Sequence, residues 1–183
     1  MRKLIAAINM TVDGFCDHTA GIPDEAIHKH YTGLLNDAGV ILYGRKTFQL
    51  MEYWKSVLKD PTAEPSMEEF AIAIDKIPKI VFSRTLQNTG WKSARLADQD
   101  PAEEVSALRR QPGKDILVGS PGLIVALTKL NLIDEYQLCI HPVVTGSGLP
   151  LFRDITETIN LQLVKTKPFA GGAIILYYQP KRV

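Results

Sequence analysis

Short apolar runs alternate with amphipathic stretches along the first two thirds of the chain. Runs rich in β-branched and other apolar residues predict buried strands at residues 4–8, 40–43, 79–82 and 116–118, with a shorter strand at 95–96. Apolar positions at helical spacing predict helices at about 24–38, 44–57, 66–76, 100–110 and 123–132. This alternation is typical of a parallel sheet that carries helices on both of its faces.

The pattern changes after residue 135, where strands are expected at about 135–144, 159–166 and 173–179. Gly171 and Gly172 separate the last two strands and predict a hairpin between them. We therefore expect an α/β fold with a mixed, mainly parallel sheet and a C-terminal antiparallel hairpin. With 183 residues, the chain has the length of a single domain spanning 1–183.

Residues with side-chain acceptors mark the expected helix starts. Asp100 and Ser120 each precede a proline and are predicted N-caps. Ser66 and Glu69 have the spacing of a capping box.

Composition excludes several classes of protein. The hydrophobic content of 45% is ordinary for a globular domain, and a net charge of +1 without a long basic stripe argues against nucleic acid as the main partner. Cys16 and Cys139 form no C-x-x-C pair, so neither a disulfide scaffold nor a thiolate zinc site is expected. The apolar run after Met1 is too short for a signal peptide, and no segment reaches transmembrane length. We expect a cytoplasmic protein with no membrane partner.

Polar and glycine residues follow four of the expected strands. They form the loops Asp13-Gly14, Gly44-Arg45-Lys46-Thr47, Ser83-Arg84-Thr85 and Gly119-Ser120-Pro121-Gly122. In open α/β sheets, ligands bind beyond the carboxyl ends of the strands, and glycine lets the backbone approach a ligand closely. The basic residues in the second loop oppose the helix dipole, and a bound anion would remove this conflict.

The loop at Gly119 leads from a buried strand into a helix and leaves backbone N–H groups that suit phosphate. Taken alone, each loop is also explained without a ligand, as an ordinary helix start or as a polar turn with solvated side chains. Together, two arginines, a lysine, hydroxyls and glycines predict a ligand with several phosphates. The sequence has no clear counterpart of the acidic residue that binds ribose in an NAD site, which favours NADPH.

Other chemistries have weaker support. Gly146-Ser147-Gly148 lacks the third glycine of a dinucleotide fingerprint and is interpreted as a turn, and the sequence contains neither a P-loop nor a Gly-x-Ser-x-Gly motif. His28 and His30 are two residues apart on a predicted helix and face nearly opposite sides, so we expect no metal site.

The strand-end motifs resemble those of the dihydrofolate reductase superfamily. The sequence is most similar to the reductase domain of bacterial riboflavin-biosynthesis deaminase/reductases and their stand-alone relatives. The resemblance covers nearly the whole chain, through residues 8–15, 42–48, 79–85, 118–123, 132–136 and 142–148 together with Phe152. One departure is Ser120, because many relatives have consecutive glycines there. The H-x-E and P-C-x-x-C signature of the zinc deaminase half is absent.

This resemblance implies a dihydrofolate reductase-like three-layer fold and an NADPH-dependent reductase. It also implies a homodimer, since relatives are commonly dimers. The first strand and the Asp13 loop would lie near the nicotinamide, and the other three loops would hold the phosphates and the adenosine half. The implied cofactor-binding residues are Ala7, Asp13, Gly14, Gly44, Arg45, Lys46, Thr47, Ser83, Arg84, Gly119, Ser120, Gly122 and Leu123.

Catalytic residues are harder to identify, because hydride transfer needs no protein nucleophile. Asp24 or Glu25 lies where the resemblance expects a carboxylate that engages the substrate, although helix capping is the simpler interpretation. Trp54, near the end of a predicted helix, is a candidate wall of the substrate pocket. The leading hypothesis is a reductase of a small heterocyclic or carbonyl substrate, most like 5-amino-6-(5-phosphoribosylamino)uracil reductase. The alternatives are a dihydrofolate reductase and a non-catalytic nucleotide-binding protein.

Overall fold

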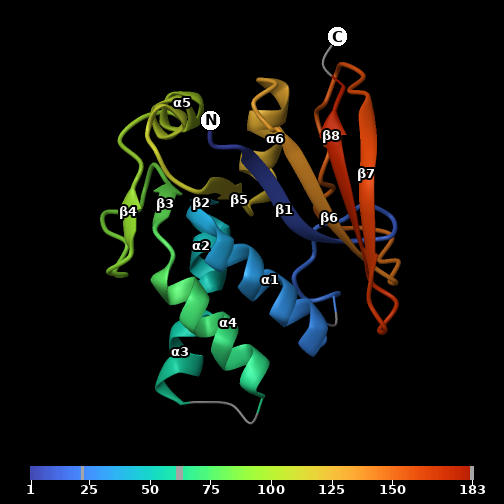
Figure 1. The fold of residues 1–183 in the computed structure, drawn as a ribbon, viewed down its shortest axis with the longest axis horizontal. Helices are drawn as coiled ribbons and strands as arrows, with labels where there is room; N and C mark the ends of the chain where they lie inside the picture. The colour runs from blue at the N-terminus through green and yellow to red at the C-terminus, as the bar shows by residue number, and fades with distance from the viewer. Residues whose placement is uncertain (22, 61–63, 182–183) are drawn as a thin grey trace.

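The strands of the chain form one sheet in the order β4-β3-β2-β5-β1-β6-β8-β7 (Figure 1). The computed structural model describes residues 1–21, 23–60 and 64–181. The strands are β1 (Leu4–Thr11), β2 (Ala38–Gly44), β3 (Lys79–Phe82), β4 (Ala94–Leu96), β5 (Asp115–Val118), β6 (Glu135–His141), β7 (Leu161–Pro168) and β8 (Ile174–Pro180).

Helices cover both faces of the sheet. Figure 1 shows that they form two groups, one on each side of the sheet. The first group is α1 (Glu25–Asp37), α2 (Arg45–Met51), α3 (Tyr53–Lys59) and α4 (Pro65–Lys76), and the second is α5 (Pro101–Arg110) and α6 (Pro121–Lys129). This arrangement confirms the predicted three-layer α/β fold.

The core lies on both faces of the sheet because the side chains of each strand alternate between them. On β1, Leu4 belongs to the cluster that packs against Ile124 of α6, while the next residue, Ile5, belongs to the cluster that contains Leu35 of α1 and Ile74 of α4. Leu4, Ile74 and Ile124 are completely buried. These two apolar layers fix the sheet between its helices.

Parallel pairing places the strand-end loops at one edge of the sheet. β1 pairs in parallel with β5 and β6, and β2 pairs in parallel with β3 and β5. The carboxyl ends of these strands therefore lie at the same edge. β8 departs from this pattern, because it pairs antiparallel with β6 and with β7, and its pairing with β7 is the predicted hairpin.

Three details differ from the sequence predictions. The first strand continues to Thr11, three residues beyond its predicted end. The single helix predicted over 44–57 is two helices, α2 and α3, with Glu52 between them. The break lets Phe48 pack against Trp91, with ring centroids 5.8 Å apart, while Trp54 packs against Phe70 at 4.5 Å.

The third difference concerns helix starts. The carboxylate of Asp100 accepts hydrogen bonds from the N–H groups of Ala102 and Glu103, as predicted for an N-cap. The predicted capping box at Ser66 is wrong, because α4 begins at Pro65 and Ser66 is buried in its first turn. Proline has no N–H to satisfy and its φ suits the first helical position, which moves the start of the helix ahead of the serine.

Candidate functional site

One hydrogen bond joins the starts of two helices at the carboxyl edge of the sheet. The backbone N–H of Gly44 donates to Oγ of Ser120 at 2.9 Å. Gly44 is the N-cap of α2 and Ser120 is the N-cap of α6, where its side chain is almost completely buried. The bond therefore ties the β2–α2 junction to the β5–α6 junction.

The Ser120 hydroxyl accepts from Gly44, and neither α2 nor α6 has a side-chain cap on its first backbone N–H groups. Ser120 occupies the predicted N-cap position, but its hydroxyl makes no hydrogen bond to the first turn of α6, and glycine cannot cap α2 with a side chain. The first backbone N–H groups of a helix have no partner within the helix and carry the positive end of its dipole. A Cβ added at Gly122 would meet no other atom within 4 Å, so a ligand has room beside this turn. The two helix starts together suit a ligand with more than one anionic group.

Arg45 connects α2 to the loop after β3. One of its guanidinium nitrogens donates to the hydroxyl of Thr85 at 2.7 Å. In the same loop, Oγ of Ser83 accepts from the N–H groups of Thr85 and Leu86 and so holds the turn that presents Arg84, which is exposed. The structure thus brings together the second and third predicted loops.

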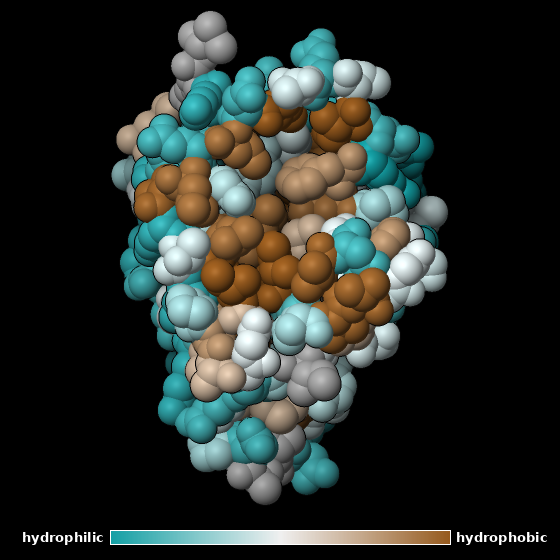
Figure 2. Space-filling view, turned by 90° about the vertical axis from the view of Figure 1, so that its right-hand side faces the viewer, coloured by the Kyte–Doolittle hydropathy of each residue, from teal (hydrophilic) through white to brown (hydrophobic). Residues whose placement is uncertain are grey.

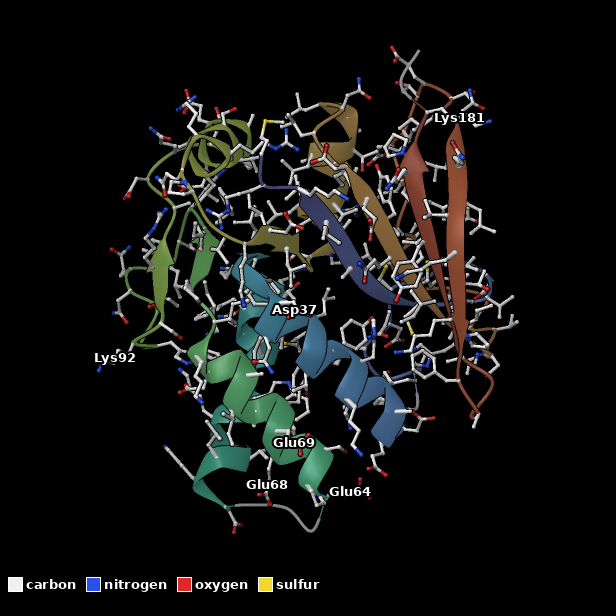
Figure 3. All side chains as sticks on the ribbon, viewed as in Figure 1. Asp37, Glu64, Glu68, Glu69, Lys92 and Lys181 are labelled. Carbon is white, nitrogen blue, oxygen red and sulfur yellow. The ribbon has the colours of Figure 1, made fainter. Side chains whose placement is uncertain are left out.

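The basic residues of these loops keep their positive charge available. Within residues 1–21, 23–60 and 64–181, no carboxylate forms an ion pair with Arg45, Lys46 or Arg84. Figure 3 shows the acidic side chains Glu64, Glu68 and Glu69 around the amino end of α4. This end of the helix points away from the sheet. Because the basic side chains are exposed and clustered, they favour an anion at this edge.

Gly119 lets three strands approach one another beside this loop cluster. A Cβ added at Gly119 would lie 3.2 Å from the ring of Tyr43 on β2 and 3.7 Å from the carbonyl oxygen of Ala7 on β1. A side chain there would push the strands apart or block the space between them. Ala7 is half-buried and lies next to the start of the β5–α6 junction. Leu123, by contrast, has its side chain in the core, so only its backbone can face a ligand.

Asp13 ties its loop to the segment that follows β6. Its carboxylate accepts from the Thr11 hydroxyl at 2.5 Å and from the backbone N–H of Gly146 at 2.7 Å. These hydrogen bonds, the one from Thr11 foremost, hold the pKa of Asp13 below its ordinary value. The next residue, Gly14, has φ of +89°, which glycine adopts without strain. The geometry therefore gives Asp13 a loop-holding role, and contact with a nicotinamide stays a prediction.

Three further candidates lie apart from these loops. Asp24 is the N-cap of α1 and accepts from the N–H of Ile27 at 2.8 Å, as the capping interpretation predicts. Glu25 forms an exposed ion pair with Lys29, and these two residues line a shallow hollow together with Asp24 and Ala26. The ring contacts of Trp54 are with residues of the helical layer, namely His28, Tyr53 and Phe70.

The sequence analysis missed a polar cluster on the α1 face of the sheet. Oδ1 of Asn9 accepts from the hydroxyl of Tyr31 at 3.1 Å and lies 3.0 Å from Nε2 of His141. The clue was a polar residue that directly follows an apolar strand run, but the predicted strand ended at residue 8. The three side chains come from β1, α1 and β6 and meet only in the folded chain.

The described part of the chain shows neither a metal-binding cluster nor a membrane-spanning helix. Residues 1–21, 23–60 and 64–181 contain no group of three or more histidine, cysteine or acidic side chains arranged to hold a metal ion. Across the same ranges, no helix has the length and apolar character needed to cross a membrane.

Comparison with known proteins gives a consistent result. The family model described as the RibD C-terminal domain matches residues 2–175. The chain is 38% identical over 181 residues to the uncharacterized protein YyaP of Bacillus subtilis (strain 168), covering 97% of this chain and 94% of YyaP. Its structure is similar to that of a pyrimidine reductase-like protein from Corynebacterium diphtheriae, with a TM-score of 0.70 and 16% identity over 100% of this chain and 93% of the other. It is also similar to dihydrofolate reductase from Enterococcus faecalis complexed with NADP(H), with a TM-score of 0.62 and 14% identity over 98% and 97% of the two chains. At these identities the structural likeness shows the fold.

Proposed function

The chain belongs to the RibD C-terminal domain family, and from this premise we propose that it is an NADPH-dependent reductase. The proposed substrate is a small heterocyclic or carbonyl compound, most like 5-amino-6-(5-phosphoribosylamino)uracil. The pyrimidine reductase-like protein with the same fold supports this substrate class.

The observation that carries the proposal is the hydrogen bond between Gly44 and Ser120. It holds two helix starts together, and neither start has a side-chain cap. A dinucleotide has a pyrophosphate in its middle, and NADPH has a further phosphate on the adenosine ribose. The N–H groups of the two helices suit the pyrophosphate, while Arg45 and Arg84 suit the additional phosphate.

The residues present fit NADPH in three respects. The basic side chains have no carboxylate partner among the described residues, Gly122 leaves open space beside α6, and Gly119 brings the carbonyl of Ala7 close to the same junction. When bound, NADPH supplies the hydride for reduction. The chain binds and orients the cofactor through α2 and α6 and presents the α1 face of β1 to the substrate.

Dihydrofolate reduction is the alternative activity. The hydrogen bonding of Asp24 disfavours this activity. One oxygen of this carboxylate is already used to cap α1. Glu25 is paired with Lys29 on the surface. Asp24 and Glu25 therefore both interact with groups of α1 itself, which favours the pyrimidine substrate over a pterin.

We also propose that two copies associate through the β7–β8 side of the sheet. β7 is an edge strand whose residues after Leu161 are all exposed, including Leu163 at 49% and Val164 at 52%. Figure 2 views this side and shows apolar side chains gathered across the middle of the face. An exposed edge strand and a contiguous apolar surface are both features of protein interfaces.

The activity is tested by following the oxidation of NADPH by the purified protein with each of two compounds. Oxidation that depends on 5-amino-6-(5-phosphoribosylamino)uracil would support the proposal. Oxidation with dihydrofolate alone would support the alternative activity. Tight NADPH binding with no oxidation in either mixture would favour a non-catalytic nucleotide-binding protein.

A further inference from the structure

Asn9 is exposed although it lies on β1, a strand in the interior of the sheet. Its side-chain oxygen has two neighbouring donors, the hydroxyl of Tyr31 at 3.1 Å and Nε2 of His141 at 3.0 Å. An amide oxygen has two lone pairs and can only accept, so these donors saturate Oδ1 and require the hydrogen of His141 to be on Nε2.

The surroundings hold this arrangement in place. The parallel register of β1 and β6 puts Thr11 opposite His141 and Asn9 opposite Cys139, so these side chains share one face of the sheet. The backbone of Gly21 covers the imidazole, since a Cβ added there would lie 3.2 Å from Nε2. Burial lowers the pKa of His141 and nearby Asp24 acts in the opposite direction, which leaves a mainly neutral ring at neutral pH.

The amide nitrogen of Asn9 has no hydrogen-bond partner within this cluster. Among the hydrogen bonds of the described ranges, none involves Nδ2. Asn9 is two residues from Ala7 on the same face of β1, and the carbonyl of Ala7 lies beside the β5–α6 junction. Two fixed amide hydrogens are thus presented next to the region proposed for the reactive end of the cofactor.

We propose that Asn9 binds the substrate by donating its amide hydrogens to a carbonyl oxygen or an unprotonated ring nitrogen. Tyr31 and His141 are positioning residues, because they hold Oδ1 and so direct Nδ2 to the substrate. This inference rests on the proposed reductase function and narrows its substrate to compounds with such an acceptor. Pyrimidinones and related carbonyl heterocycles have it. A site built around a fixed donor discriminates against compounds that lack the matching acceptor.

The first test is Asn9→Asp, which keeps the shape of the side chain and replaces the donor with a carboxylate oxygen. With NADPH and whichever of 5-amino-6-(5-phosphoribosylamino)uracil or dihydrofolate the wild-type protein reduces, kcat/KM should fall by about 30-fold or more. The Kd for NADPH should change by less than about threefold, since the phosphates supply most of the charge-assisted contacts. Asn160→Asp makes the same change at an exposed position before β7 and should leave both values unaltered.

The second test asks whether Tyr31 acts through Asn9. Tyr31→Phe removes one of the two hydrogen bonds to Oδ1 and should lower kcat/KM by about 3-fold to 10-fold. In an Asn9→Ala background the same substitution should have almost no further effect, because nothing remains to be positioned. An equal loss in both backgrounds would overturn the positioning role.

The outcomes separate this inference from the proposed function. A protein that does not bind NADPH refutes the proposed function and the inference with it. A wild-type enzyme whose kcat/KM is unchanged by Asn9→Asp refutes the inference alone. If NADPH binds but neither acceptor-bearing compound is reduced, the cofactor site stands, while the reductase activity and the substrate-binding role of Asn9 are both refuted.

Discussion

Oγ of Ser120 accepts the backbone N–H of Gly44 at 2.9 Å, across 76 residues of sequence. The two helices that begin at these residues therefore share one anchor, and neither is capped by its own N-cap side chain. The family resemblance of the sequence leads one to expect a second glycine after Gly119, and Ser120 has a structural role at that position instead. It fixes the relative position of two sets of backbone donors.

Ser120→Ala should weaken both stability and cofactor binding. The N–H of Gly44 loses its acceptor, which should lower the free energy of unfolding by about 1–2 kcal/mol. Loss of the anchor should raise the Kd for NADPH by about 3-fold to 10-fold. Denaturant unfolding and a fluorescence titration measure the two effects. Ser106→Ala, at an exposed position of α5, is the matched control and should change neither. Unaltered stability and affinity in Ser120→Ala would contradict the anchoring role.

Arg45→Glu should distinguish between the two nicotinamide cofactors. If Arg45 binds the additional phosphate as proposed, removing its guanidinium should weaken NADPH by about 10-fold to 100-fold and NADH by less than about threefold. Arg110→Glu reverses a charge at the end of α5, just before β5 begins, and so at the opposite edge of the sheet. It should leave both affinities unchanged. Equal losses for NADPH and NADH in Arg45→Glu would show that Arg45 does not recognise that phosphate.

His30 should make the fold less stable in mild acid. Burial, together with the charges of Lys167 and Lys165, lowers its pKa to about 4. The unfolded chain binds this proton near pH 6.5, so the unfolded state holds more protons between pH 6.5 and about 4, and stability falls as the pH falls through that range. The full shift corresponds to about 3.4 kcal/mol, but His30 is only half-buried and solvent screens it, so His30→Gln should remove roughly 2 kcal/mol of this pH dependence. The same change at exposed His18 is the control. A pH profile of unfolding that is identical in wild type and His30→Gln would contradict the effect.

Val164→Lys should break the proposed association of two copies. The substitution places a charge on β7 in the exposed apolar surface. Sedimentation should show a dimer for the wild-type protein and a monomer for Val164→Lys, with NADPH binding retained. Ile72→Lys, which replaces an exposed apolar residue of α4, should remain a dimer. A monomeric wild-type protein would refute the proposed dimer.

The sequence predicted the loops of the site better than the contacts between them. Strands that alternate with helices imply parallel pairing, so the loops with Arg45 and Ser83 could be placed at one sheet edge from pattern alone. The partner of Ser120 could not be predicted, because a hydroxyl at a helix start ordinarily caps its own helix.

The polar cluster shows the same limit more clearly. Asn9 and His141 are separated by 132 residues, and their contact depends on the register of β1 and β6. Local patterns contain no information on such a register. Ser66 is a different case, in which one local signal, Pro65 at the first helical position, overrode another.

Binding of NADPH and NADH to the purified wild-type protein, measured by titration of cofactor fluorescence, tests the central claim most directly. If the helix starts of α2 and α6 and the arginines beside them form an NADPH site, NADPH should bind with a Kd about 10-fold or more below that of NADH. Equal affinities would contradict the role given to the additional phosphate, and no binding of either cofactor would contradict the reductase function itself.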